Sequence, residues 1–222
     1  MLRYLDVQNI LDKNDLILQE SGCVGSENER GNTYMKKIGI VTDSHSSISQ
    51  EEAEKLGIFV LPMPFYIDGE CFYESVTLSR ELFFEKLAAG ADITTSQPSP
   101  TAVMEIWDKA LEQFEKILYM PISSGLSGSY ETAMMLAKDE AYEGRVLVVD
   151  DGQVAAPLHQ MVLDTLDMIE KGYEAEQIRD LLERAGDRMM IYIALQTLEC
   201  LKKGGRVTPA AAALGSVFHI NP

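Results

Sequence analysis

The sequence has few of the residues that build disulfide frameworks or metal centres. Its 222 residues include three cysteines and three histidines, which are widely spaced and form no C-x-x-C pair. Reduced thiols are the simplest interpretation of so few cysteines, and no local spacing suggests a metal site. No apolar run reaches the roughly 18 residues that a membrane span needs. We therefore expect no disulfide scaffold, no bound metal and no transmembrane segment.

Positive charge is also scarce. The 19 Lys and Arg residues stand against 35 Asp and Glu residues, which gives a formal net charge of −16. A chain this acidic is repelled by phosphate backbones, so nucleic-acid binding is not expected. Residues 1–6 do not form a basic start followed by an apolar stretch, and we expect a cytoplasmic protein. Hydrophobic residues make up 46% of the chain, a usual share for a globular protein.

The first 34 residues differ in composition from the rest. Residues 20–33 are polar and glycine-rich and have little to bury, which is typical of a linker or a disordered segment. A β-branched run at residues 38–41 then predicts a strand. We therefore expect residues 1–34 to be a disordered or non-native extension, with Met35 as the true start.

From residue 38 onwards, strand and helix signals alternate. Ser49 and Ser79 precede helical segments as caps, and Ser99-Pro100 combines a cap with a first-turn proline. Asp68-Gly69 separates two extended segments and predicts a hairpin. Alternating strands and helices indicate an α/β fold with a parallel sheet, and the hairpin indicates a second, smaller layer. The predicted strands cover 38–41, 58–61, 64–67, 116–121, 145–149 and 189–194, and the predicted helices cover 49–56, 80–89, 100–114, 127–138, 157–170, 175–185, 197–203 and 209–214.

Three loops are rich in small hydroxyl residues: 42–47, 94–99 and 123–130. Each leads into a predicted helix, and free N–H groups and the helix dipole favour an anion at a helix start. A parallel sheet would bring such loops to one edge, where ligands bind. The alternative is that these Ser and Thr residues only cap helices and fill turns.

The loops favour a singly charged ligand over a polyphosphate. None of the three contains Lys or Arg, and no G-x-x-x-x-G-K-[ST] motif occurs in the chain. Residues 125–129 (GLSGS) resemble the nucleophile elbow of a hydrolase, but Ser129 stands where the last glycine should be. His159 and Asp164 are available as partners, yet nothing in the sequence places them there. Asp43 is either a base or a residue that orders its own loop.

Several motifs occur in the order seen in the DegV family. The most specific pair is residues 95–99 (TSQPS) and 201–206 (LKKGGR). The others are residues 42–44 (TDS), 65–69 (FYIDG), 123–130 (SSGLSGSY) and 149–150 (VD). The chain resembles this family over residues 36–222.

The resemblance implies a DegV-like α/β fold, with a parallel three-layer α/β/α sheet domain and a smaller two-layer α/β domain that is incomplete here. Within a DegV-like region over 35–222, the sheet domain is expected mainly at 36–60 and 91–156. The partial second domain is expected at 61–90 and 157–222. Family members continue further at the C-terminus, so we also expect a truncated chain with an open tunnel and an unpaired edge in its second sheet.

The resemblance also implies a lipid-binding subunit and not an enzyme. Such a protein binds a long-chain fatty acid and presents its carboxyl group to a separate bacterial fatty acid kinase, which forms acyl phosphate for phospholipid synthesis. No catalytic residue and no cofactor besides the bound fatty acid is implied. By the family pattern, Ser96 binds the carboxyl group. The implied ligand-binding residues are Asp43, Ser44, Thr95, Ser96, Ser124, Gly125, Ser127, Gly128 and Ser129, and the implied kinase-binding residues are Lys202, Lys203 and Arg206.

Some residues depart from the family pattern or allow another interpretation. Pro64 stands where members often have a Thr that helps bind the carboxylate. His159 lies in a usually glycine-rich segment, where it either alters the tunnel or lies on the surface. Lys202 and Lys203 are alternatively a solvated helix end. Two other functions stay open: a small-molecule enzyme related to dihydroxyacetone-kinase-type proteins, and an inactive truncated remnant.

Overall fold

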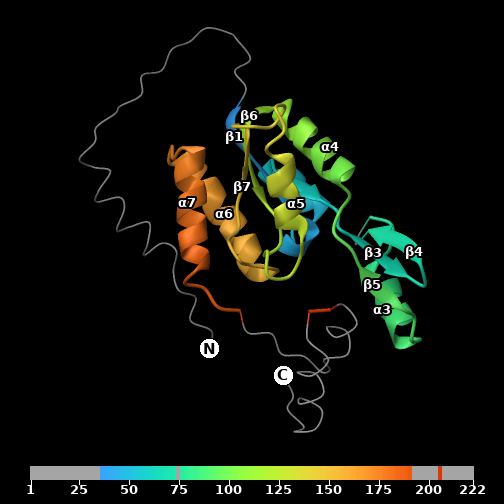
Figure 1. The fold of residues 1–222 in the computed structure, drawn as a ribbon. Helices are drawn as coiled ribbons and strands as arrows, with labels where there is room; N and C mark the ends of the chain where they lie inside the picture. Colours follow the sequence, from blue (N-terminus) through green and yellow to red (C-terminus); the bar gives the residue numbers. More distant parts are fainter. Residues whose placement is uncertain (1–35, 74–75, 192–204, 207–222) are drawn as a thin grey trace.

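The computed structural model describes residues 36–73, 76–191 and 205–206 (Figure 1). Its larger part is built on a four-stranded sheet with the strand order β2-β1-β6-β7, in which all three strand pairs are parallel. The strands are β1 (Lys36–Asp43), β2 (Phe59–Leu61), β6 (Phe114–Met120) and β7 (Val146–Val148). The predicted α/β class with a parallel sheet is therefore confirmed.

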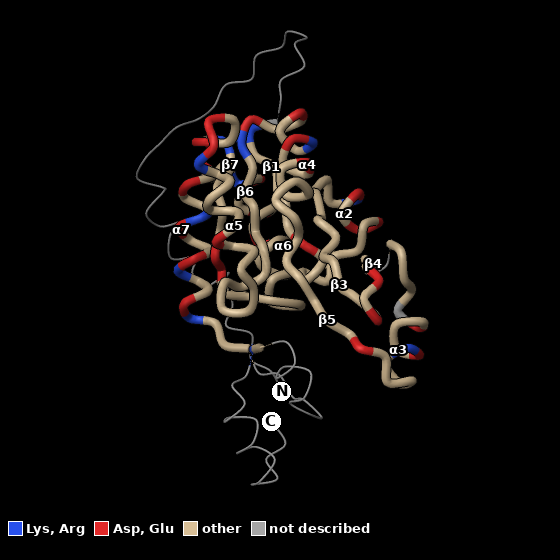
Figure 2. Tube along the Cα trace, turned by 45° about the vertical axis from the view of Figure 1, so that its right-hand side comes forward, with Lys and Arg blue, Asp and Glu red and all other residues tan. Residues whose placement is uncertain are grey.

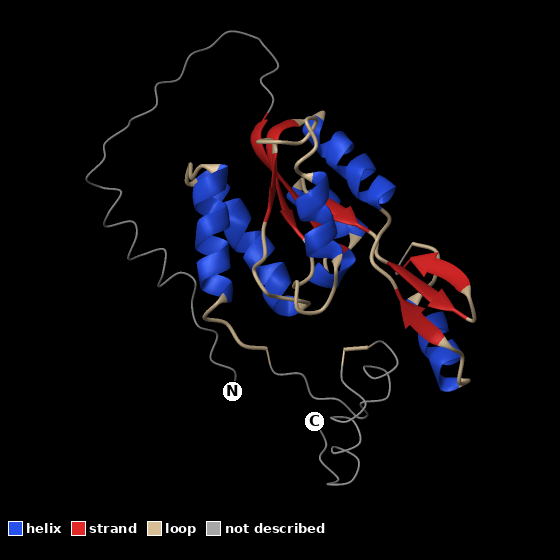
Figure 3. Ribbon diagram, viewed as in Figure 1, coloured by secondary structure: helices blue, strands red, loops and turns tan. Residues whose placement is uncertain are grey.

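Helices cover both faces of this sheet (Figures 1 and 3). Alternate side chains of a strand point to opposite faces, so Ile40 packs with one group of helices and Val41 with the other. The first group is α2 (Gln50–Leu56), α6 (Ala156–Glu170) and α7 (Ala175–Gly186), and the second is α4 (Pro100–Leu111) and α5 (Ser129–Leu136). This is the expected three-layer α/β/α arrangement.

A smaller antiparallel sheet lies beside the large one. It consists of β3 (Pro64–Ile67), β4 (Glu70–Tyr73) and β5 (Ile93–Thr95), in the order β4-β3-β5, with helix α3 (Arg80–Ala88). Asp68 and Gly69 both have positive φ, 51° and 86°, as a two-residue hairpin turn of type I′ requires. Phe83 of α3 packs edge-on against Phe65 of β3, with ring centroids 5.6 Å apart. The predicted hairpin and its smaller layer are confirmed.

Three serines begin helices as the sequence predicted. The side chains of Ser49, Ser79 and Ser99 each accept a hydrogen bond from the backbone N–H three residues further on, at 3.1, 3.3 and 3.2 Å. Each bond satisfies one of the free N–H groups in a first helical turn. The starts of α2, α3 and α4 are therefore set locally.

Several helix boundaries differ from their predicted positions by one to three residues, and two of the differences have a clear cause. The helix that begins at Pro100 ends at Leu111, because Phe114 is buried and pairs with the first residue of β1 as the start of β6. Helix α5 begins at Ser129 and not at Ser127, because the Ser127 side chain accepts the Ser129 N–H at 3.2 Å. Long-range pairing and a local side-chain bond override the sequence pattern here.

The packing of α6 and α7 differs from the expected division of the chain. Residues 157–222 were assigned to the smaller domain, but Leu158 of α6 and Ile178 of α7 are fully buried in the core of the large sheet. Each helix has one apolar stripe, and the large sheet offers the face that covers it. Conversely, β5 belongs to the small sheet, although residues 91–156 were expected in the large one.

Other expectations fall partly or wholly outside the described residues. The extension over 1–34, the helices over 197–203 and 209–214, and residues 192–194 of the last expected strand are among them. Residues 189–191, which are described, form neither strand nor helix.

The contact between α7 and the loop after β7 gives a stability prediction. A Cβ on Gly186 would overlap the backbone carbonyl of Asp151, which cannot rotate away. Gly186→Ala should therefore lower the free energy of unfolding by about 1–3 kcal/mol, measured by urea denaturation. Gly125→Ala is the control, because its Cβ would meet only Ser123 Oγ at an ordinary 3.5 Å. Equal stability of the two variants would contradict this close packing.

Candidate functional site

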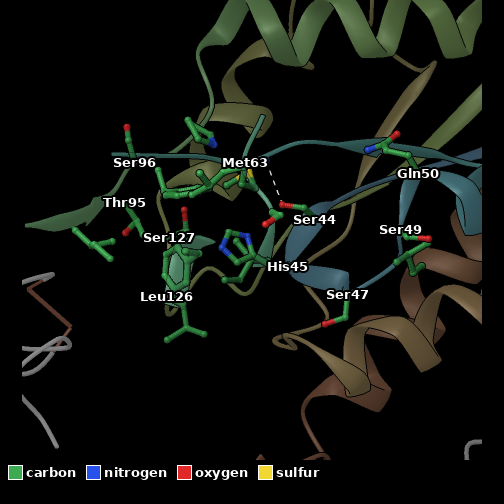
Figure 4. A pocket seen from close by; sticks show the side chains of 18 of the residues that line it. Ser44, His45, Ser47, Ser49, Gln50, Met63, Thr95, Ser96, Leu126 and Ser127 are labelled. Carbon is green, nitrogen blue, oxygen red and sulfur yellow. Dashed lines mark hydrogen bonds between the residues drawn. The ribbon is translucent and has the colours of Figure 1, made fainter. Parts of the chain in front are cut away.

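A cavity of about 610 Å³ lies where the carboxyl ends of β1 and β6 face the small sheet (Figure 4). Its size falls within the range of about 300–1,000 Å³ that is typical of small-molecule sites. Its polar lining residues are Ser44, His45, Ser47, Ser49, Gln50, Ser79, Thr95, Ser96, Ser127 and Arg206. Hydroxyl groups dominate this part of the wall.

The apolar part of the wall comes largely from the small layer. Phe65 of β3 contacts Phe83 of α3, and the Phe83 and Phe84 rings are edge-on with centroids 5.5 Å apart. The apolar lining residues are Ile48, Met63, Pro64, Phe65, Leu78, Phe83, Phe84, Ile93, Ile122 and Leu126. The cavity therefore combines a hydroxyl-rich wall with an aromatic and aliphatic one.

Asp43 joins the loops that carry the polar wall. It ends β1, is 0% exposed, and accepts hydrogen bonds from the backbone N–H groups of His45 at 2.9 Å and Ile122 at 2.8 Å. Ile122 follows β6, the strand next to β1 in the sheet. The carboxylate thus fixes the loop after β1 against the loop after β6. Asp43 is not among the residues that line the cavity, and its contacts fit the loop-ordering alternative.

One further hydrogen bond connects the loop after β1 to the segment that leads into the small sheet, and a second lies within the small sheet, between β3 and the residue after β5. The Met63 N–H donates to the Ser44 hydroxyl at 3.1 Å, and the Ser96 N–H donates to the Pro64 carbonyl at 3.4 Å. Ser44, Pro64 and Ser96 all line the cavity. The wall is therefore continuous from the loop after β1 to the exit of β5.

The structure divides the predicted ligand-binding residues into two sets. Ser44, Thr95, Ser96 and Ser127 line the cavity. Figure 4 shows Thr95 and Ser96 on one side of it, Ser49 and Gln50 on the other, and His45 and Ser127 between them. Besides Asp43, the predicted residues outside the lining are Ser124, Gly125, Gly128 and Ser129.

The residues outside the lining support the loop after β6. Ser129 is 2% exposed, and its hydroxyl lies 2.8 Å from that of Ser127. The Ser124 N–H donates to the Asp150 carboxylate at 3.3 Å. These contacts hold Ser127 at the cavity from behind.

The sequence pattern that resembled a nucleophile elbow does not form a hydrolase triad. His159 points to helix α2, with Nε2 3.1 Å from the carboxylate of Glu52, and does not line the cavity. His45 does line the cavity, but the contacts of the described residues include no hydrogen bond between it and Ser127. Of the two alternatives for His159, its contact with Glu52 agrees with a position outside the cavity.

His45 is a polar lining residue that the predicted ligand-binding set did not include. Its side chain is 37% exposed, and its Nδ1 lies 3.3 Å from Asp43 Oδ1, outside hydrogen-bond geometry. The loop 42–47 was recognised by its hydroxyls and its strand-end Asp. The histidine within it carried no spacing signal, because only the fold directs it into the cavity.

Of the three predicted kinase-binding residues, Arg206 is described. Its Nε–H donates to the Leu126 carbonyl at 3.4 Å, and its side chain lines the cavity. Among the described lining residues it is the one with a permanent charge. Lys202 and Lys203 lie outside the described residues.

A second buried carboxyl group stands behind the site. Asp151 follows β7, is 1% exposed, and accepts the Gln153 N–H at 2.9 Å. Burial raises the pKa of Asp151 to about 7, and the nearby charges of Asp150 and Asp43 raise it too. The Gln153 carbonyl in turn accepts the Ser123 N–H at 3.0 Å. This loop therefore supports the one that carries Ser127.

Two features are absent from residues 36–73, 76–191 and 205–206. No three His, Cys, Asp or Glu side chains in these ranges come together as metal ligands. The helices of the same ranges include none that is long and apolar enough to cross a membrane.

A family model described as "Uncharacterised protein, DegV family" matches residues 37–222. Among curated proteins, a DegV domain-containing protein of Caldanaerobacter subterraneus subsp. tengcongensis is 30% identical over 188 residues, and one of Deinococcus radiodurans is 34% identical over 186 residues. The alignments cover 85% and 83% of this chain, and 67% and 66% of the relatives. The chain thus spans about two thirds of their length.

Solved structures share the fold. A DegV family protein from Thermus thermophilus, described by its fatty acid binding, matches with a TM-score of 0.72 at 34% identity, over 81% of this chain and 64% of that one. A stearic-acid-binding protein from Eubacterium ventriosum matches with a TM-score of 0.66 at 26% identity, over 80% and 64%.

The raised pKa of Asp151 predicts how stability varies with pH. Its pKa of about 7 lies above the ordinary 3.8, so its protonated form adds stability that is full below about pH 4 and is lost as the pH rises through 7. The Asp151→Asn side chain stays neutral at every pH. The free energy of unfolding of this variant should therefore exceed that of the wild type by up to a few kcal/mol at about pH 8, and by much less at about pH 5.

Urea unfolding at the two pH values measures this difference. Asp187→Asn, an exposed position just after α7, is the control and should change little at either pH. A difference between Asp151→Asn and the wild type that stays constant with pH would contradict the assignment.

Proposed function

The chain belongs to the DegV family, and on that premise we propose that it binds a long-chain fatty acid in the cavity between its two sheets. One observation carries the proposal: the lining of a cavity of about 610 Å³ combines hydroxyl groups with aromatic and aliphatic side chains. A fatty acid likewise combines a carboxylate with an apolar chain. The fatty acid binding described for the Thermus thermophilus relative supports this assignment.

The apolar wall supplies most of the affinity in this proposal. Phe65, Phe83 and Ile93 surround space into which the acyl chain extends. Each methylene that leaves water for such a wall gains about 0.8 kcal/mol. The affinity therefore comes mainly from the length of the acyl chain, and the polar residues of the lining mainly orient the carboxylate.

The polar wall holds the carboxylate through hydroxyl groups. Ser127 lies two residues before the first residue of α5, Ser129. The N-terminus of a helix provides a favourable electrostatic potential for an anion. The Ser96 hydroxyl donates to the neighbouring Gln97 carbonyl at 3.1 Å, so it must rotate to reach a ligand. The Ser127 hydroxyl is also engaged, since it lies 2.8 Å from that of Ser129, so Ser127 differs from Ser96 mainly in its place at a helix start.

We further propose that the protein is a binding subunit and that a separate fatty acid kinase phosphorylates the bound carboxyl group. The chain has no phosphate-binding loop of the G-x-x-x-x-G-K-[ST] type. Arg206 lies at the cavity, and Lys202 and Lys203 precede it in the chain by four and three residues, so the basic segment includes a residue of the cavity wall. A cytoplasmic location fits this role.

A charge placed in the apolar wall tests the lipid site. Phe83→Asp should lower the affinity of the 222-residue protein for palmitate at least about tenfold, because a carboxylate would face the acyl chain. Glu85→Gln, an exposed change on the same helix, should have no effect. Native mass spectrometry and titration with a fluorescent fatty acid provide the measurements. A wild-type protein that neither co-purifies with nor binds fatty acid would contradict the proposed function.

Charge reversal in the basic segment tests the proposed kinase contact. The double variant Lys202→Glu/Lys203→Glu should slow acyl phosphate formation by an added fatty acid kinase about tenfold or more, and more strongly at low salt. Its affinity for fatty acid should stay within about twofold of the wild type. Lys37→Glu, at the opposite end of β1, is the matched control. An unchanged rate of acyl phosphate formation with the double variant would contradict the proposed kinase contact.

A further inference from the structure

His45 brings an imidazole ring into the proposed lipid site. The residue follows Ser44 at the end of β1, and Figure 4 shows its ring between the Ser44 and Ser127 side chains. Its backbone is held on both sides: the N–H donates to Asp43 at 2.9 Å, and the carbonyl accepts the Ala155 N–H at 2.7 Å. The base of the side chain is therefore fixed relative to the cavity.

Asp43 determines which ring nitrogen faces the cavity. His45 Nδ1 is buried and lies 3.3 Å from Oδ1 of Asp43, whose carboxylate is 0% exposed. A nitrogen that faces a carboxylate is favoured as N–H over a lone pair. Nε2 is left on the exposed part of the ring, and it has no hydrogen-bond partner among the described residues.

Few other charges face this ring. In the described part of the lining, Arg206 is the one permanent charge, and no Asp or Glu is present. Helix α6 packs near residues 44–46, but its His159 pairs with Glu52 of α2. Asp43 is thus the anion beside the ring, and the ring stands between Asp43 and the cavity.

Apart from Arg206, the other donors in the described lining are neutral or absent. Pro64 has no N–H and no polar side chain. Ser44 already accepts the Met63 N–H, although its own hydroxyl hydrogen is still able to donate. A charged imidazole would make a shorter and stronger bond to a carboxylate than these neutral hydroxyls do.

We propose that His45 binds the carboxylate of the ligand through Nε2, and that the carboxylate enters the cavity together with one proton from solvent. With Nδ1–H directed to Asp43, Nε2 donates only when both nitrogens carry a proton. The imidazolium then lies between two anions, Asp43 and the ligand. A neutral ring that accepts from a protonated carboxyl group takes up the same single proton.

This role of His45 rests on the proposed fatty-acid binding and adds head-group selectivity to it. The wild-type 222-residue protein is titrated by calorimetry with laurate and with methyl laurate, which has the same chain without the charge. Two buffers of different ionisation enthalpy at one pH give the number of protons taken up. Laurate binding should take up a substantial fraction of one proton, whereas ester binding should take up none.

Two substitutions at His45 separate the ring from its nitrogens. His45→Phe keeps a ring of similar shape and should weaken laurate binding about tenfold to a hundredfold, the usual range for a hydrogen bond to a charged group. Its affinity for methyl laurate should change less than about threefold, and its proton uptake should disappear. His45→Gln restores a donor near Nε2, so it should recover part of the laurate affinity without proton uptake.

His159→Phe is the matched control. His159 is a partly buried histidine with a carboxylate at 3.1 Å, but it does not line the cavity. Its replacement should leave both affinities and the proton uptake unchanged. Thermal unfolding of each variant checks that the fold is retained, and His45→Gln keeps the test valid if His45→Phe unfolds.

The outcomes distinguish this role from the lipid-binding proposal itself. An equal loss of acid and ester binding in the His45 variants, an unchanged laurate affinity, or an undiminished proton uptake would overturn the role of His45 and leave fatty-acid binding intact. A wild-type protein that binds neither ligand would overturn the proposed function, and the role of His45 with it.

Discussion

The buried carboxylate of Asp43 is the contact on which the polar wall of the cavity depends. One side chain accepts N–H groups from the loop after β1 and from the loop after β6, at 2.9 and 2.8 Å. A buried charge without such donors would cost several kcal/mol, so the two loops and the carboxylate stabilise one another. The resulting junction directs His45 and Ser127 to one side while Asp43 stays behind the wall.

The site also depends on how the two sheets are joined. The bond from Met63 to Ser44 connects the loop after β1 to the segment that leads into the small sheet, and the bond from Ser96 to Pro64 extends the pairing of β5 with β3. That sheet and α3 contribute the aromatic wall. Both layers contribute to the lining, with Thr95 and Phe65 from the small one and Ser127 and Ile122 from the loop after β6, so the site is a property of their junction.

Local signals predicted much of the fold, and long-range contacts decided the rest. Ser49, Ser79 and Ser99 predict the starts of their helices, and Asp68-Gly69 predicts its hairpin. Both signals lie within about four residues of sequence, because caps and tight turns are local. The end of α4 is decided by the pairing of Phe114 with β1, far away in sequence. The placement of α6 and α7 on the large sheet needed knowledge of which face was still uncovered.

The same distinction holds for the candidate site. Family motifs and loop composition located Ser44, Thr95, Ser96 and Ser127, which line the cavity. They did not single out His45, whose orientation depends on Asp43.

Net charge says little about whether such a cavity accepts an anion. Acidic residues are spread over several elements, α2 and α7 among them (Figure 2), and the total charge is −16. Exposed charges more than about 8–10 Å from a bound ligand are largely screened from it at physiological salt. A charged group about 4 Å from the ligand, by contrast, interacts with it several times more strongly near a protein than the same pair would in bulk water. The described lining has no carboxylate of its own and includes Arg206, His45 and hydroxyl donors. The acidity that argues against nucleic-acid binding over a broad surface is therefore compatible with a carboxylate held at one enclosed point.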